Sequence, residues 1–180
     1  MSGARQANPP VLSVRDLSVT FRHETGETRA VAGVSFTVGA GETLAIVGES
    51  GSGKSVTALG ILGLLPRSAD VAVGGSARLG EAELVGASER ALRQVRGNRI
   101  AMIFQEPMTA LNPLHRVERQ IAETLALHRG LEGAAAAARI DALLREVALV
   151  DAEGSTARIR RSFPHELSGY RHVADDATRQ

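Results

Sequence analysis

The sequence predicts an α/β protein, in which antiparallel strands, short buried strands and a glycine-rich loop precede two amphipathic helices. Alternating apolar and polar residues predict antiparallel strands at residues 11–21 and 31–38. A glycine-rich loop at residues 48–55 follows an apolar run and precedes a helix-favouring segment. Two amphipathic stripes between residues 117 and 150 predict two helices.

The bulk composition is that of a globular protein. Its 180 residues are 43% apolar, enough for one core, either as one domain or as a domain with a small appended lobe. With 21 basic and 20 acidic residues and no long run of one charge, we expect no nucleic-acid partner. The absence of cysteine excludes disulfides, thiolate metal sites and thiol nucleophiles. The longest strongly apolar stretch is far shorter than the roughly 20 residues of a membrane span, so membrane association would be peripheral.

The first part of the chain is predicted to form strands around a turn. Residues 1–10 are polar, end in two prolines and are interpreted as a flexible leader. The strands at 11–21 and 31–38 come next. Three apolar residues of the second strand share one face: Val34, Phe36 and Val38. After a turn at 39–42, the continuous apolar run 43–47 is typical of a fully buried central strand.

Helix signals and turn signals alternate in the next segment. Good helix formers predict a helix over 54–65, which Pro66 stops. Residues 71–84 contain two adjacent glycines and alternating apolar residues, which indicates a hairpin or two short strands. Ser88 is a typical N-cap for a short helix that Gly97 ends.

A second buried strand is predicted at residues 100–104, followed by a proline-containing loop and then by two amphipathic helices. The first apolar stripe is Val117, Ile121 and Leu125, and the second is Ala136, Ile140, Leu143, Leu144 and Val147. The alanine run 134–138 indicates helix propensity. Core packing is the simplest explanation of both stripes.

Residues 48–55 read Gly-Glu-Ser-Gly-Ser-Gly-Lys-Ser and match the P-loop pattern G-x-x-x-x-G-K-[ST]. Glycines let backbone N–H groups converge on an anion, and the positive end of the following helix dipole points at the same place. Lys54 is the only lysine among 21 basic residues, and a compact ammonium can reach between two phosphates. The motif predicts binding of ATP with Mg²⁺, with Ser55 as a metal ligand. A Gly/Ser-rich loop without function is the alternative.

Two further segments carry a family resemblance. Residues 104–113, Phe-Gln-Glu-Pro-Met-Thr-Ala-Leu-Asn-Pro, closely resemble the Q-loop of ATP-binding cassette (ABC) subunits, specifically the peptide and nickel (dipeptide/oligopeptide) importer group. Residues 161–169, Arg-Ser-Phe-Pro-His-Glu-Leu-Ser-Gly, are similar to the approach to that family's LSGGQ signature. Residues 48–65 and 96–104 are similar to the same group, and the resemblance covers about residues 11–169.

The resemblance implies an incomplete ABC-type P-loop NTPase domain, an α/β fold whose mixed sheet is accompanied by an antiparallel β lobe and a helical lobe. Its P-loop core with the β lobe would span residues 11–104, the Q-loop and helical lobe 105–169, and a tail outside the family pattern 170–180. The implied nucleotide-binding residues are Phe21, Gly48, Ser50, Gly51, Ser52, Gly53, Lys54, Ser55, Val56, Gln105, Ser168 and Gly169, and the implied metal ligands are Ser55 and Gln105. No catalytic residue is assigned.

Three of these residues have roles that only the resemblance supplies. Phe21 would stack on the adenine from the loop after the first strand; the alternative is that it is only the end of a buried strand face. Gln105 would complete the Mg²⁺ shell and sense the γ-phosphate, its alternative being a surface glutamine in a turn. Ser168, with backbone amides at a helix start, would contact the γ-phosphate of ATP held by a partner subunit.

The same resemblance implies the partners and the location. The helical lobe would dock on integral-membrane permease subunits, and a second ATP-binding subunit would complete a homo- or heterodimer. A periplasmic or extracellular binding protein would act indirectly, and the chain would lie peripherally on the cytoplasmic side of the plasma (inner) membrane. No histidine site for a metal is expected, because ligand spacing is lacking among His23, His115, His128, His165 and His172.

The sequence departs from the family pattern after Gly169. Tyr170 stands where the signature has its second glycine, which would impair the approach of a partner's phosphate. No four apolar residues precede an Asp-Glu pair, so the Walker B aspartate, the catalytic glutamate, the D-loop and the switch histidine are all missing. Residues 43–47 would then keep an unpaired edge and an uncovered apolar face. We therefore expect a truncated or frameshifted product.

These observations favour one function over two others. The chain is interpreted as the ATP-binding subunit of an ABC importer for peptides or a similar substrate, in which ATP hydrolysis by this chain alone is not expected. The alternative is a non-catalytic fragment that binds nucleotide or permease without turnover. A P-loop kinase of a small metabolite would leave the Q-loop and Leu-Ser-Gly segments unexplained.

Overall fold

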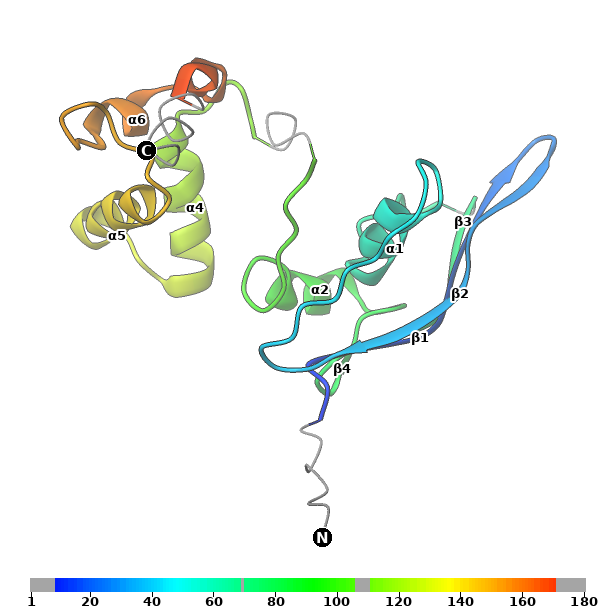
Figure 1. Cartoon of the computed structure of the whole chain (residues 1–180). Helices are drawn as coiled ribbons and strands as arrows, with labels where there is room; N and C mark the ends of the chain where they lie inside the picture. The colour runs from blue at the N-terminus through cyan, green and yellow to red at the C-terminus, as the bar shows by residue number, and fades with distance from the viewer. Residues whose placement is uncertain (1–8, 69, 106–110, 171–180) are drawn as a thin grey trace, which may run out of the picture. The chain divides into compact units, whose positions relative to one another are not determined.

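The structure is a computed structural model that describes residues 9–68, 70–105 and 111–170. It divides into two compact units, Met1–Arg96 and Gly97–Gln180 (Figure 1). Apart from its two prolines, the predicted leader lies outside the described residues, as do residues 106–110 and the tail after Tyr170. No helix among the described residues is long and apolar enough to span a bilayer.

The first unit is built on a four-stranded sheet in the order β2-β1-β3-β4, with every pair antiparallel (Figure 1). The strands are β1 Leu12–His23, β2 Gly26–Val38, β3 Val71–Leu79 and β4 Ala82–Glu83. They confirm the predicted strands at 11–21 and 31–38 and the predicted hairpin at 71–84. Val14, Leu17 and Val19 of β1 are at most 1% exposed. Val14 and Leu17 are three residues apart, and a register shift between them interrupts the strict alternation of the strand.

A break in register between β1 and β3 explains the paired glycines of β3. Asp16 has a left-handed backbone, with φ 49°, and the pairing shifts between Arg15 and Ser18. A Cβ on Gly75 would lie 2.4 Å from the carbonyl oxygen of Asp16. Only glycine fits this bulge, because any side chain would collide with the neighbouring backbone.

Two helices complete the first unit, α1 Lys54–Ile61 and α2 Glu89–Val95. The helix predicted over 54–65 ends four residues early at Ile61, before Pro66 is reached, because Gly63 takes a left-handed φ of 61° and turns the chain. The Ser88 side chain accepts a hydrogen bond from the Ala91 N–H, which confirms the predicted N-cap.

The buried central strands predicted at 43–47 and 100–104 are wrong. Neither segment is a strand, and Ile46, Val47 and Ile103 are 48%, 89% and 93% exposed. An extended segment becomes a strand only when a neighbour satisfies its N–H and C=O groups, and among the described residues no strand pairs with either segment. The uncovered apolar face expected for residues 43–47 is therefore confirmed.

The second unit is helical. It contains α4 Val117–Arg129, α5 Gly133–Glu146, α6 Ala157–Arg161 and the 3-10 helix η1 Pro164–Tyr170. Helices α4 and α5 confirm the two predicted amphipathic helices and the helical alanine run. The sequence did not predict α6 or η1, because neither segment carries an apolar stripe.

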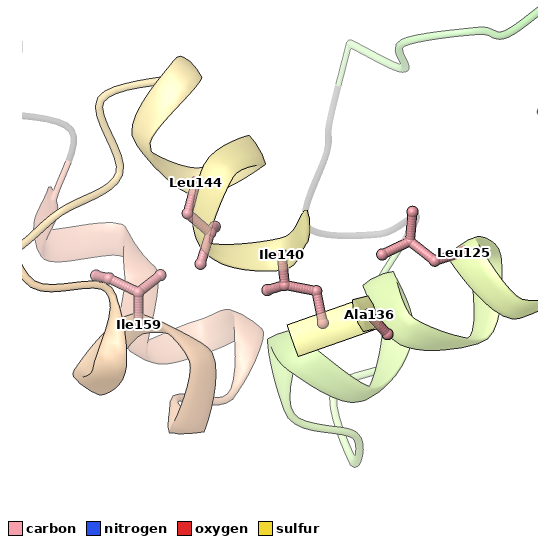
Figure 2. Close-up of a cluster of buried hydrophobic side chains, with 5 residues drawn as sticks. All are labelled: Leu125, Ala136, Ile140, Leu144 and Ile159. Atoms are coloured by element: carbon pink, nitrogen blue, oxygen red, sulfur yellow. The ribbon is translucent and has the colours of Figure 1, made fainter. Parts of the chain in front are cut away.

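Figure 2 shows the core of this unit, where side chains from α4, α5 and α6 meet. The cluster consists of Leu125, Ala136, Ile140, Leu144 and Ile159, each at most 7% exposed. One predicted member of the second stripe is wrong: Val147 follows the end of α5 and is 63% exposed. Val147 is the C-cap residue, with φ −100° and ψ 15°, so its backbone departs from helical geometry and its side chain does not follow the buried face of α5.

Candidate nucleotide-binding site

The P-loop lies between the extended segment 43–47 and the first turn of α1. Gly51 and Gly53 have left-handed φ angles of 81° and 88°, which glycine adopts without steric cost. A Cβ on Gly53 would lie 2.3 Å from the carbonyl oxygen of Ala30 in β2. The last loop glycine is therefore required both by its backbone angle and by its contact with the sheet.

The ammonium of Lys54 lies inside the loop. Its Nζ donates hydrogen bonds to the carbonyl oxygens of Gly48 at 2.8 Å and Glu49 at 2.6 Å, and lies 3.2 Å from the Ser52 hydroxyl. The Ser52 N–H donates to the Glu49 carbonyl at 3.2 Å, which closes the turn around the lysine. The only lysine of the chain thus holds the positive charge at the centre of the glycine-rich loop.

The start of α1 supplies further donors beside this charge. The first N–H groups of a helix have no intrahelical partner, and here they belong to the turn that contains Ser55 and Val56. No acidic residue lies in this first turn, so the positive end of the helix dipole is not neutralised. Backbone donors, an ammonium and an exposed Ser55 hydroxyl in one loop fit a magnesium-bound polyphosphate.

Sequence reasoning missed two residues that shape the loop. The Thr57 hydroxyl and N–H both donate to the Gly53 carbonyl, at 2.9 and 2.8 Å, and anchor the loop to α1. A threonine three residues after the P-loop lysine can form such a bond to the carbonyl four residues back, so the signal was present. The Ala30 carbonyl carries no sequence signal, because its contact with Gly53 joins distant segments.

Phe21 is not in a loop after the first strand, as the resemblance had implied. It lies within β1, paired with Thr28 of β2 and Val71 of β3, and is half-buried. The strand extends further because the β1–β2 hairpin closes only at Gly26. Thr28 lies two residues from Ala30, so Phe21 and the loop glycine Gly53 approach the same part of β2.

The remaining predicted residues belong to the second unit. Gln105 is exposed, and Ser168 and Gly169 lie in η1. The expectation that Ser168 stands at a helix start is wrong, because η1 begins earlier, at Pro164. The structure thus brings the P-loop residues together with the Phe21 strand, and places the Q-loop and signature residues in the other unit.

Comparison with known proteins identifies the family of this site. A family model described as "ABC transporter" matches residues 31–171, which include the whole P-loop. The chain belongs to the ABC transporter family. The ABC fold is shared with a solved structure, the ATP-binding cassette MJ0796 bound to ADP and Pi, at a TM-score of 0.67 and 24% identity. That alignment covers 88% of this chain and 63% of the other.

Two ABC transporter relatives are more similar in sequence. A probable peptide ABC transporter ATP-binding protein, y4tR of Sinorhizobium fredii, is 50% identical over 91% of this chain and 49% of its own length. A peptidoglycan transport ATP-binding protein, YejF of Agrobacterium fabrum, is 53% identical over 89% of this chain and 29% of its own length. The chain spans about half the length of the first relative and less of the second.

Proposed function

We propose that the chain binds ATP with Mg²⁺ through residues 48–56 and acts as an ATP-binding subunit of an ABC importer. The observation that carries this proposal is the position of Lys54, whose ammonium lies among the loop oxygens of Gly48, Glu49 and Ser52. A polyphosphate bound there would take the place of loop oxygens as a partner of this ammonium. It would also accept hydrogen bonds from the N–H groups of the first turn of α1. Mg²⁺ would neutralise phosphate charge, with Ser55 and Gln105 as its protein ligands.

The proposed roles of the other site residues follow from their places in the family pattern. Phe21, half-buried in β1, would contact the adenine. Ser168 and Gly169 would face the nucleotide of a second ATP-binding subunit. The proposed transported solute is a peptide or a similar substrate, because the two relatives above are named for peptide and peptidoglycan transport.

The proposed partners are integral-membrane permease subunits and a second ATP-binding subunit, with a binding protein acting on the outer side. The chain would sit peripherally on the cytoplasmic face of the membrane. We expect no hydrolysis by these 180 residues alone above that of a Lys54→Ala control, because no run of four apolar residues is followed by an Asp-Glu pair in the sequence.

Calorimetric titration with ATP and Mg²⁺ tests the binding proposal. Lys54→Ala should weaken ATP binding at least about tenfold, which corresponds to loss of one charge-assisted contact. Lys54→Arg should not restore binding, because a planar guanidinium does not fit among three loop oxygens. The matched control is Arg119→Ala, which removes one exposed positive charge from α4.

A second variant separates the metal from the phosphate. Ser55→Ala should keep measurable ATP binding without metal and lose most of the gain that Mg²⁺ provides. Circular dichroism on each variant confirms that the fold is retained. Equal ATP affinity for the unmodified chain and Lys54→Ala would overturn the proposal.

A further inference from the structure

Helix α6 is too short to hold its own position. It has five residues, Ala157–Arg161, and isolated helices of that length are unstable in water. It nevertheless leads directly into η1, which carries Ser168 and Gly169. The contacts that fix α6 to the rest of the unit therefore also fix the position of the start of η1.

One arginine joins α6 to both longer helices. Nε of Arg160 lies 3.2 Å from Oε2 of Glu118 on α4, and its Nη1 lies 3.2 and 3.3 Å from the two carboxylate oxygens of Asp141 on α5. The side chain of Arg160 is 24% exposed, less than the arginines of the surface ion pairs in this unit. Partly buried ion pairs are screened less by solvent and salt than exposed ones.

Asp141 also holds the other end of α6. Its Oδ1 accepts a hydrogen bond of 2.5 Å from the hydroxyl of Thr156, the residue that precedes the helix and is buried. Between these two polar contacts Ile159 is fully buried in the core cluster. Helix α6 is therefore fixed at its start, its middle and its end.

The junction between α6 and η1 is fixed to the start of α4. The Ser162 carbonyl accepts a hydrogen bond of 3.0 Å from the Val117 N–H, and the guanidinium of Arg116 lies 6.0 Å from the centre of the Phe163 ring. Only two residues, Ser162 and Phe163, separate α6 from η1. Because this connection is so short, a movement of α6 would also move η1.

We propose that Arg160 is a positioning residue, which sets the place of the Leu-Ser-Gly segment by bridging Glu118 of α4 and Asp141 of α5. The inference rests on the proposed function, because it is that function which gives η1 its role as the segment facing a partner's nucleotide. The fork of the guanidinium is required, because Arg160 contacts the two carboxylates through separate nitrogens, Nε and Nη1, whereas lysine has a single nitrogen on a shorter side chain.

Hydrogen exchange followed by mass spectrometry on the intact 180-residue chain tests this role. In Arg160→Met, amides of residues 157–167 should exchange about tenfold faster, while those in the middle of α4 and α5 keep their protection. Arg160→Lys should recover part of the protection and not all of it. Arg139→Met, which breaks the exposed ion pair with Glu146 on α5, should leave residues 157–167 unchanged.

Each outcome decides the question. Unchanged exchange at residues 157–167 in Arg160→Met would overturn the proposal, as would a uniform increase across the whole second unit. If Arg160→Met fails to fold, Glu118→Gln removes only one of the two bridges and should produce the same local pattern at smaller size. ATP titration in parallel keeps the two proposals distinct, because loss of Arg160 leaves the Lys54 loop intact and should not change ATP affinity.

Discussion

Nε of Arg96 donates a hydrogen bond of 2.7 Å to the carbonyl oxygen of Leu62, at the end of the helix that follows the P-loop. Nη2 of the same side chain donates to the Gly63 carbonyl at 2.6 Å, and Nη1 pairs with Glu89 at 2.9 Å. Leu62 is the C-cap residue of α1 and Gly63 follows it, so one guanidinium satisfies the two carbonyls just beyond the helix and joins the end of α1 to α2.

Replacing this arginine should destabilise the first unit. Arg96→Met leaves two partly buried carbonyls without a donor, and we expect the free energy of unfolding to fall by about 2 kcal/mol. Urea denaturation followed by circular dichroism measures the change. Arg93→Met is the control: its side chain is 78% exposed and pairs with the same Glu89, so its loss should cost at most about 0.5 kcal/mol. Equal effects of the two substitutions would contradict the capping role.

The sequence predicted those parts of the fold whose signal is local. Each of these patterns arises within one segment, because the side chains that face the core recur at the period of the strand or helix. This holds for the period-two pattern of β1 and β2 and for the apolar stripes of α4 and α5. The P-loop could be located because its residues are contiguous. The run 43–47 was misread, because burial of a central strand depends on partner strands and not on its own apolar residues. Helix α6 was missed because it is held by the contacts of Arg160 with Glu118 and Asp141 and by the buried Ile159, and these contacts leave no repeating pattern in the sequence.

The two left-handed glycines of the P-loop should tolerate alanine differently. At Gly51 no atom lies within 4 Å of the added Cβ, so only the backbone strain of a left-handed alanine remains, about 1 kcal/mol. At Gly53 the Cβ would meet the Ala30 carbonyl at 2.3 Å, and the loop or β2 must move. We expect Gly53→Ala to weaken ATP binding more strongly than Gly51→Ala, measured by calorimetry. Gly41→Ala, left-handed and open but outside the loop, should leave ATP affinity unchanged.

The core of the second unit should be sensitive at Ile140. This side chain is 2% exposed and lies between α4 and α6 residues in the cluster of Figure 2. Ile140→Ala removes buried methyl groups and leaves a cavity, at a cost of about 2–5 kcal/mol in the free energy of unfolding. Leu127→Ala deletes a similar side chain that is 76% exposed on α4, and should cost about 0.5 kcal/mol or less. Chemical denaturation of both variants tests the pair, and comparable losses would contradict the assignment of the core.

Acid should act on the second unit through Asp141. A hydrogen bond from Thr156 is the largest cause that holds the pKa of Asp141 below its ordinary value, with Arg160 and Arg145 acting in the same direction against partial burial. Because the pKa is lower in the folded state, the stabilisation is complete above the unfolded-state pKa and is lost as the pH falls towards the folded value. Asp141→Asn should therefore destabilise the chain near neutral pH and show a smaller further loss below about pH 4 than the unmodified chain. Glu123→Gln, an exposed carboxylate of α4, should reproduce neither effect in denaturation measured from pH 7 to pH 3.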